Sequence, residues 1–166
     1  MKKLAIWLTA VLAPAVLFPL NAATGTTSFS FQLTGPNTAT ASSGPFSGDT
    51  IRMTGSGSFD TAKGTVDADG SFRIIQPDGT VVESGTWQAT GFTSFTSFGG
   101  PRNGTQGGVL AITVTLTPAT GTPLTGQSMI VTCLVNKPPS FTGDEGITVG
   151  DFAASTGGTT LFHGDS

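Results

Sequence analysis

The chain has little of the chemistry that enzymes commonly use. Its 166 residues include no tyrosine, one cysteine (Cys133) and one histidine (His163). A serine triad needs a histidine base, for which His163 is the only candidate, and no Ser lies in a Gly-x-Ser-x-Gly sequence. A zinc site needs several Cys and His ligands, and the chain has one of each. No Gly-rich phosphate loop opens a helix. We therefore set these enzyme classes aside and expect no cofactor.

Charged side chains are also scarce. They make up 10% of the chain, and the formal net charge is -3. A phosphate backbone is recognised by a basic surface, so a nucleic-acid partner is not expected. Disorder would need few apolar residues and a high charge density, whereas 37% of this chain is hydrophobic. The composition indicates a folded domain.

The N-terminal segment has the layout of a secretory signal peptide. Two lysines precede an apolar run from Leu4 to Phe18, and the sequence PLNAA at residues 19–23 supplies a helix break and small residues. A bilayer span needs about 20 predominantly apolar residues, and two prolines interrupt this run. We predict a signal peptide at residues 1–22, with cleavage after Ala22 or Ala23.

The remaining residues, 23–166, have the size of one domain. No cysteine lies near the cleavage site to accept a lipid, so we expect no membrane attachment after cleavage. Removing the two N-terminal lysines leaves five basic against ten acidic side chains, a net charge of -5. The mature protein is expected to be secreted or periplasmic.

The dominant pattern after the signal segment is period-two alternation between turn-forming clusters, which is typical of half-buried strands. The clearest strand contains Leu110, Ile112, Val114 and Leu116. Other strands are expected around residues 29–33, 51–59, 66–74, 80–90, 129–135, 147–152 and 159–162. A loop is expected to begin at residues 35–37 and to run to Gly48.

Seven to nine short antiparallel strands must close into a barrel or fold into two sheets to bury their apolar faces. The local hairpin order through the middle favours a small antiparallel β-barrel built on a meander. Glycines within residues 51–59 suit the coiling of such a barrel. A two-sheet β-sandwich is the alternative.

Cys133 lies on an alternating apolar strand, on the same face as Met129 and Val131. This pattern predicts a small buried hydrophobic side chain. The functional alternatives are a reactive thiol and an intermolecular disulfide. A nucleophilic thiol would need a nearby histidine, and His163 is the only one.

Glu83 is the leading candidate for a catalytic carboxylate. Alternation places it with Val81 and Trp87, so it could point into a barrel and act as a general acid or base. The more ordinary expectation is that Glu83 faces solvent and that Val82 points inward. The adjacent valines leave the face undetermined.

The sequence DADG at residues 67–70 resembles the first half of a calcium loop. The later ligands are missing, and Arg73 is a poor neighbour for a cation. We therefore expect a tight turn or a bulge and no metal site. Calcium binding by Asp67 and Asp69 is the alternative.

Three phenylalanines at a spacing of three, Phe92, Phe95 and Phe98, match neither a strand nor a helix. In an extended chain, Phe92 and Phe98 would face one way and Phe95 the other. Core packing is one interpretation. The functional interpretation is an apolar opening at one end of the barrel, in which these residues and Trp87 bind an apolar ligand.

The sequence therefore predicts an exported, non-catalytic β-domain that binds a small apolar ligand or a partner surface. The alternative is a barrel enzyme that uses an inward carboxylate, Glu83 or an aspartate, on an apolar substrate. Asn103-Gly104-Thr105 matches the N-glycosylation pattern, but we favour a turn at this position.

Overall fold

The computed structural model describes residues 26–100 and 104–164. The predicted signal peptide at residues 1–22 and the candidate glycosylation site at Asn103 lie outside these ranges. None of the described residues forms a helix long and apolar enough to cross a membrane.

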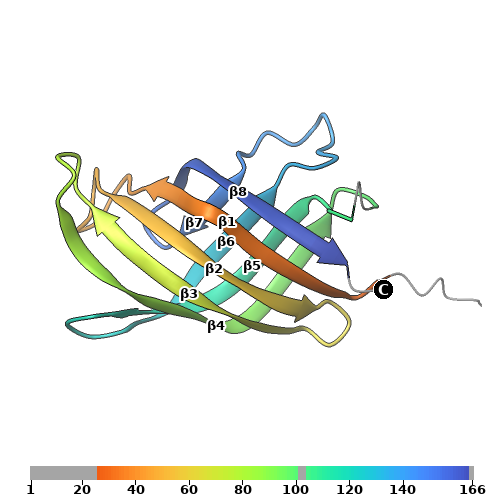
Figure 1. Ribbon diagram of the computed structural model, residues 1–166, viewed down its shortest axis with the longest axis horizontal. Coiled ribbons are helices and arrows are strands. Elements are labelled where there is room, and N and C mark those ends of the chain that lie inside the picture. Colours follow the sequence, from red (N-terminus) through yellow and green to blue (C-terminus); the bar gives the residue numbers. More distant parts are fainter. Residues whose placement is uncertain (1–25, 101–103, 165–166) are drawn as a thin grey trace, which may run out of the picture.

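Eight antiparallel strands make up the regular structure of the described residues. They are β1 (Ser28–Thr40), β2 (Thr50–Asp60), β3 (Thr65–Ile75), β4 (Val81–Ser97), β5 (Gly108–Pro118), β6 (Leu124–Cys133), β7 (Gly146–Val149) and β8 (Ala154–Gly164). Their order in the sheet is β7-β6-β5-β4-β3-β2-β1-β8. The sheet coils into a nearly closed barrel (Figure 1), which confirms the predicted barrel built on a meander.

β5 shows why the sequence folds in this way. Leu110, Ile112, Val114 and Leu116 are buried, and the residues between them are partly exposed. Successive side chains of a strand point to opposite faces, so one face of β5 lines the core. An eight-stranded barrel is just wide enough for such side chains to fill it, or to leave room for one small ligand.

β1 differs from the prediction of a loop that begins at residues 35–37. The strand continues to Thr40, and its pairing with β2 shifts between Leu33 and Asn37. Asn37 is fully buried at this bulge, and its Nδ2 donates to the carbonyl oxygen of Thr159, 3.3 Å away on β8. The turn-forming residues thus bend β1 without ending it.

The predicted turn at residues 67–70 is also wrong. These residues lie in the middle of β3, where Asp67 pairs with Ser58 and Gly70 with Gly55 on β2. Gly70 serves packing rather than a turn, because the indole ring of Trp87 passes over it. A Cβ on Gly70 would stand 2.5 Å from Trp87 Nε1.

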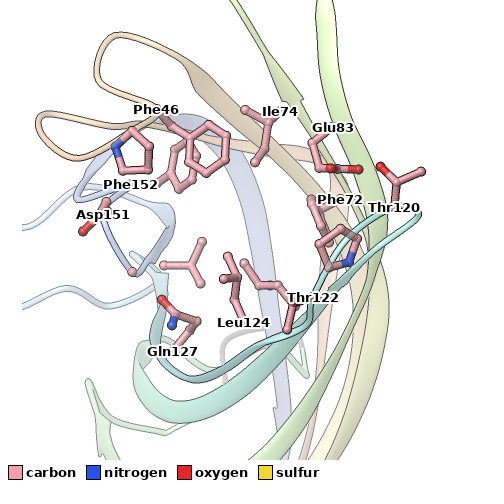
Figure 2. Close-up of a pocket in the computed structure, with 15 residues that line it drawn as sticks. Phe46, Phe72, Ile74, Glu83, Thr120, Thr122, Leu124, Gln127, Asp151 and Phe152 are labelled. Carbon is pink, nitrogen blue, oxygen red and sulfur yellow. The ribbon is translucent and has the colours of Figure 1, made fainter.

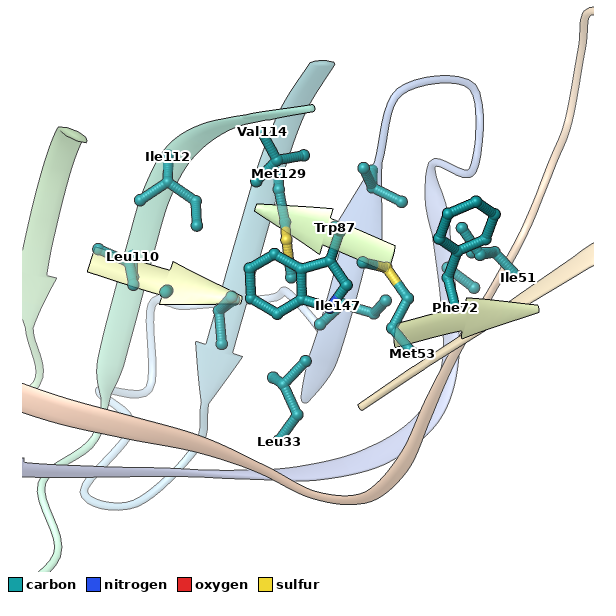
Figure 3. Packing of buried hydrophobic residues seen from close by; sticks show 14 of the residues in the cluster. Leu33, Ile51, Met53, Phe72, Trp87, Leu110, Ile112, Val114, Met129 and Ile147 are labelled. Carbon is teal, nitrogen blue, oxygen red and sulfur yellow. The ribbon is translucent and has the colours of Figure 1, made fainter. Parts of the chain in front are cut away.

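Trp87 fills the middle of the barrel (Figure 3). Its side chain is 1% exposed, and its Nε1 donates to the carbonyl oxygen of Thr54, 2.9 Å away. A Cβ on Gly55 would stand 2.5 Å from Trp87 Cζ2, so the glycines of β2 and β3 provide the space for the ring. Buried side chains pack around the ring at this level of the barrel.

The two ends of the barrel differ. One end, which we call the pocket end, carries the loops at residues 41–49, 76–80, 119–123 and 150–153. The opposite end, the Phe end, contains the phenylalanine cluster, whose members are Phe29, Phe31, Phe59, Phe92, Phe95 and Phe162. Ring centroids of neighbouring members lie 4.9 to 6.3 Å apart.

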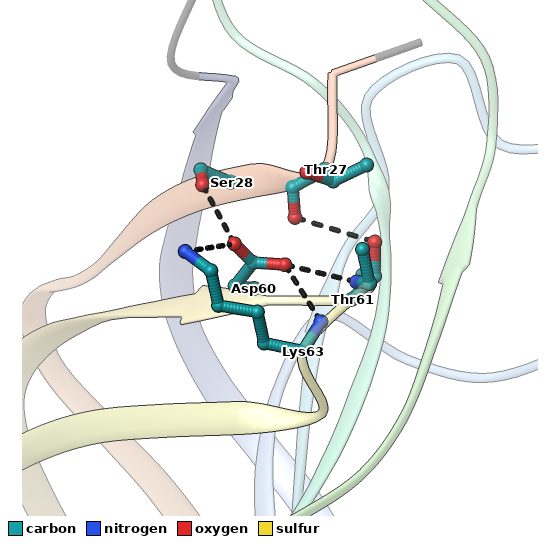
Figure 4. Close-up of polar contacts among 6 residues, drawn as sticks. Thr27, Ser28, Asp60, Thr61 and Lys63 are labelled. Carbon is teal, nitrogen blue, oxygen red and sulfur yellow. Dashed lines mark hydrogen bonds and ion pairs between the residues drawn. The ribbon is translucent and has the colours of Figure 1, made fainter. Parts of the chain in front are cut away.

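Asp60 fixes the turn between β2 and β3 at the Phe end (Figure 4). Its Oδ1 accepts hydrogen bonds from the backbone N–H groups of Ala62 and Lys63, both at 2.9 Å. Its Oδ2 lies 3.0 Å from Lys63 Nζ and accepts from Ser28 Oγ at 3.2 Å. The Lys63 backbone and ammonium groups are the main reason that the pKa of Asp60 lies below its ordinary value.

Hydrogen bonds that involve side chains link β8 to Glu145, the residue that precedes β7; β7 and β8 are the two ends of the sheet. Glu145 Oε1 accepts a hydrogen bond from the backbone N–H of Thr160 at 3.1 Å, and Ser155 Oγ donates to the Glu145 carbonyl oxygen at 2.7 Å. Further along β8, the backbone N–H of Gln106 donates to the carbonyl oxygen of Phe162 at 2.8 Å. These contacts cover strand edges that would otherwise expose unpaired backbone groups.

Candidate binding pocket

A pocket of about 470 Å³ opens at the pocket end of the barrel (Figure 2). This volume is within the range of natural small-molecule sites. The pocket is lined by strand residues and by three loops: Pro45, Phe46, Phe72, Ile74, Glu83, Leu116, Pro118, Thr120, Thr122, Leu124, Gln127, Val149, Gly150, Asp151 and Phe152.

The inner face of the sheet forms the apolar wall of the pocket. Phe72 and Ile74 of β3 are buried there, and Leu116 of β5 pairs with Trp87 of β4. Trp87 thus lies in the layer directly beside the pocket wall and separates it from the phenylalanine cluster. The strands hold these side chains in fixed positions, so the wall is preformed.

Two loops contribute an aromatic pair to the pocket. Phe46 comes from the loop between β1 and β2, and Phe152 from the loop between β7 and β8. Their rings are stacked, with centroids 5.9 Å apart and an interplanar angle of 26°. Phe152 is buried and Phe46 is half-buried, so this pair covers one side of the pocket.

Glu83 faces the interior, and the expectation that it points to solvent is wrong. It pairs with the buried Ile74 of β3, and residues directly opposite each other in a ladder share a face. The pairing shifts between Ile74 and Ile75, so both Val81 and Val82 remain exposed. Glu83 lines the pocket in a half-buried position.

The Glu83 carboxylate has one hydrogen bond among the described residues. Its Oε1 accepts from the backbone N–H of Ser84 at 3.0 Å. The other carboxylate of the pocket, that of Asp151, belongs to an exposed loop residue. No Lys, Arg or His is among the lining residues. The pocket is therefore an apolar hollow with acidic groups and no basic one.

Exposed apolar side chains concentrate at the same end. Val81, Val82 and Leu124 are the large hydrophobic residues with the greatest exposure among those described. Val81 and Val82 are the first two residues of β4, and Leu124 is the first residue of β6. Leu124 also lines the pocket. Single exposed apolar residues are ordinary on protein surfaces, and these three lie at the same end of the barrel as the pocket.

The predicted ligand residues Phe92 and Phe95 lie at the Phe end, away from this pocket. Both pack against the core, and Phe95 also borders a shallow hollow of about 460 Å³ beside Phe29. Phe98 lies beyond the end of β4 and contacts Phe141, with ring centroids 4.9 Å apart. The structure does not bring the triplet together around one mouth.

The expectation that Phe95 faces away from Phe92 is wrong. Phe92 pairs with Ile112 and Phe95 with Leu110, and both partners are buried on the inner face of β5. A register shift between Phe92 and Ser94 inserts an extra residue into β4. Because of this bulge, Phe92 and Phe95 point to the same face although they are three residues apart.

Asp67 and Asp69 are both exposed on β3. Their side chains stand two residues apart on the outer face, opposite Ser58 and Ser56 of β2. No cluster of three or more His, Cys, Asp or Glu side chains able to hold a metal ion occurs among the described residues. A calcium loop does not form here.

Cys133 ends β6 with a side chain that is 1% exposed. Met129 and Val131 are buried beside it, which confirms the predicted inward face. Burial raises the pKa of the Cys133 thiol above its ordinary value, so the thiolate is disfavoured. His163 lies on the exposed end of β8, where its Nδ1 is 2.9 Å from the Gly104 carbonyl oxygen.

Phe46, Phe152 and Leu124 were not predicted to belong to a site. Phe46 could have been noticed because it is the one aromatic residue in a loop rich in Ser and Gly, and loops of this composition are usually polar. The sequence predicts that Phe152 ends a strand, whereas β7 ends at Val149 and Phe152 lies in the loop that follows. Which loops meet at one end of a barrel depends on strand number and order.

Comparison with known proteins gives no match to a family model, to a curated protein or to a solved structure.

Proposed function

We propose that this protein is an exported, non-catalytic binding protein whose pocket takes a small apolar ligand. The observation that carries the proposal is the 470 Å³ hollow at the pocket end, whose walls are mostly apolar. Side chains pack the interior around Trp87, whereas this end of the barrel leaves a space of the size that natural small-molecule sites have.

The walls define the chemistry of the ligand. Phe72, Ile74, Leu116 and the Phe46–Phe152 pair offer an apolar enclosure that an aliphatic or aromatic body can fill. Transfer of such a body from water is favourable by roughly 25 cal/mol per Å² of buried apolar surface. Acidic groups without a basic partner favour a neutral or cationic head over a carboxylate.

Binding of a neutral, environment-sensitive dye such as Nile red tests the proposal. The mature protein is expected to bind the dye with a rise in fluorescence. Energy transfer from Trp87, the one tryptophan among the described residues, should report the bound dye. Hexanol and hexylamine are expected to displace it at lower concentrations than hexanoate does.

Leu124→Ser should weaken dye binding several-fold, because Leu124 lines the pocket. Val82→Ser is the matched control: the two side chains are 43% and 42% exposed at the same end of the barrel, and Val82 does not line the pocket. The proposal fails if the wild type binds no dye, or if both variants lose binding equally.

The inward position of Glu83 favours a second candidate, a barrel enzyme that acts on an apolar substrate. The carboxylate lines the pocket and could serve as a general acid or base. In that case the protein would hydrolyse a probe such as 4-nitrophenyl hexanoate, and Glu83→Gln would abolish turnover while dye binding persisted. A binding protein predicts no turnover above that of buffer.

Export is part of the proposal and rests on the signal-like sequence at residues 1–22. Expression of the full chain should yield a product that begins at Ala23 or Thr24. Intact-mass analysis that finds Met1 retained in the folded protein would contradict it.

A further inference from the structure

Two arginines face each other on the outside of the barrel. Arg52 of β2 and Arg73 of β3 are directly opposite in the ladder, and both are exposed. Residues in this relation have Cβ atoms about 5 Å apart, and like charges in such a pair repel. The chain therefore keeps an unfavourable pair at this position.

A shallow hollow of about 320 Å³ lies at the pair. Its lining consists of Arg52, Arg73, Thr54 and Ser71. Thr54 and Ser71 form the next outward-facing pair along the two strands, and their hydroxyl oxygens are 3.0 Å apart. Two guanidinium groups and two hydroxyls thus surround one patch of solvent.

No carboxylate of the described residues forms an ion pair with either arginine. The ion pair that the described residues do form joins Lys63 to Asp60, at the turn between β2 and β3. Asp69, on the same strand and face as Arg73, is four residues away. That is roughly 13 Å along a strand, beyond the Debye length of about 8 Å at physiological ionic strength.

The neighbouring strands add no acid. Thr38 of β1 is opposite Arg52, and Ser84 of β4 is opposite Arg73. Glu83, the nearest residue of β4 that could neutralise Arg73, faces the interior of the barrel. In a chain with seven basic residues and a net charge of -3, two unpaired arginines side by side form an isolated positive site.

We propose that Arg52 and Arg73 form an oxyanion-binding site on the outer face of the barrel. Its ligand is a phosphate or sulfate group, held by the two guanidinium groups and by the hydroxyls of Thr54 and Ser71. Guanidinium forks match the oxygens of such groups in geometry. A bound anion also removes the repulsion between the two arginines.

Titration of the mature protein with inorganic phosphate and with sulfate, at constant ionic strength, tests this site. The side-chain Nε–H signals of Arg52 and Arg73 are expected to shift together in NMR spectra. Arg52→Gln and Arg73→Gln should each weaken binding at least threefold, and the double variant should abolish it. A double variant at Lys63→Gln and Lys137→Gln removes the same number of charges and should bind as the wild type does.

Binding to vesicles distinguishes a lipid headgroup from a soluble oxyanion as the ligand. If the protein cosediments with phosphatidylglycerol vesicles but not with phosphatidylcholine vesicles, and if this depends on both arginines, the ligand is a lipid headgroup. Binding of the free ions without cosedimentation assigns it to a soluble ligand. The proposal is overturned if neither free ions nor anionic vesicles bind, or if binding survives in the double arginine variant.

Discussion

The carboxylate of Glu145 accepts a hydrogen bond from the backbone N–H of Thr160 across the seam between β7 and β8, with 3.1 Å between Oε1 and N. The described chain closes its barrel at this seam without a β7–β8 ladder. A side chain thus takes the place of a neighbouring strand. The edge of β8 is covered at this point by a single acceptor.

Replacement of Glu145 by alanine is expected to lower the free energy of unfolding by about 2 kcal/mol, because the Thr160 N–H loses a charged acceptor. Asp144→Ala is the control, since Asp144 is exposed and adjacent. Denaturant midpoints and the exchange rate of the Thr160 amide provide the measurement. Equal losses in both variants would show that Glu145 does not close the seam.

Gly70→Ala tests the packing of Trp87. A Cβ at this position would stand 2.0 Å from the Thr54 carbonyl oxygen and 2.5 Å from Trp87 Nε1, so both groups must move and the hydrogen bond between them is disturbed. We expect a loss of about 2 to 3 kcal/mol and a red shift of tryptophan emission. Gly91→Ala, where the nearest atom is 3.8 Å from the added Cβ, should change neither property. An unshifted emission in the Gly70 variant would contradict this packing.

The lowered pKa of Asp60 makes the stability of the protein depend on pH. Hydrogen bonds and the ammonium group of Lys63 hold the pKa of Asp60 below its ordinary value of 3.8. A depressed folded-state pKa stabilises the protein above the unfolded-state pKa, and this contribution disappears as the pH falls through the folded-state value.

The difference in stability between the wild type and Asp60→Asn should therefore be constant above about pH 5 and shrink below about pH 4. Urea midpoints measured from pH 2 to pH 7 provide the test. The exposed Asp67→Asn variant serves as a control that should follow the wild type. A difference that grows as the pH falls would have the wrong sign.

Alanine variants of Phe92, Phe95 and Phe98 distinguish core packing from ligand binding. Phe92→Ala and Phe95→Ala should each cost about 3 kcal/mol, because both rings pack in the phenylalanine cluster. Phe98→Ala should cost about 1 kcal/mol, because its ring contacts Phe141 outside the barrel core. None of the three should alter dye binding at the pocket end. A ligand mouth at the Phe end would instead lose dye binding in Phe95→Ala.

The sequence predicts much of the barrel because strand periodicity is local. β5 alternates without interruption, and its buried face can be read from Leu110 to Leu116. Bulges break this rule. The shifts near Asn37 and Ser94 each depend on pairing with another strand, so the residues around them gave a false loop and a false orientation for Phe95.

The pocket was harder to predict, because it is built by residues far apart in the sequence. The inward face of Glu83 follows from its pairing with Ile74 and from the register shift beside it, and neither is visible in the alternation of residues 81–87. Phe46 and Phe152 meet only because the loops after β1 and β7 lie at the same end of an eight-stranded barrel.

Methyl NMR of the mature protein, titrated with Nile red or hexanol, is the most direct test of the pocket. The methyl signals of Ile74, Leu116 and Leu124, which line the pocket, are expected to shift with a common saturation curve. Those of Leu33 and Leu110, deeper in the barrel, should stay in place. Saturable shifts confined to the deeper methyls, or no shifts at any ligand concentration, would contradict binding in this pocket.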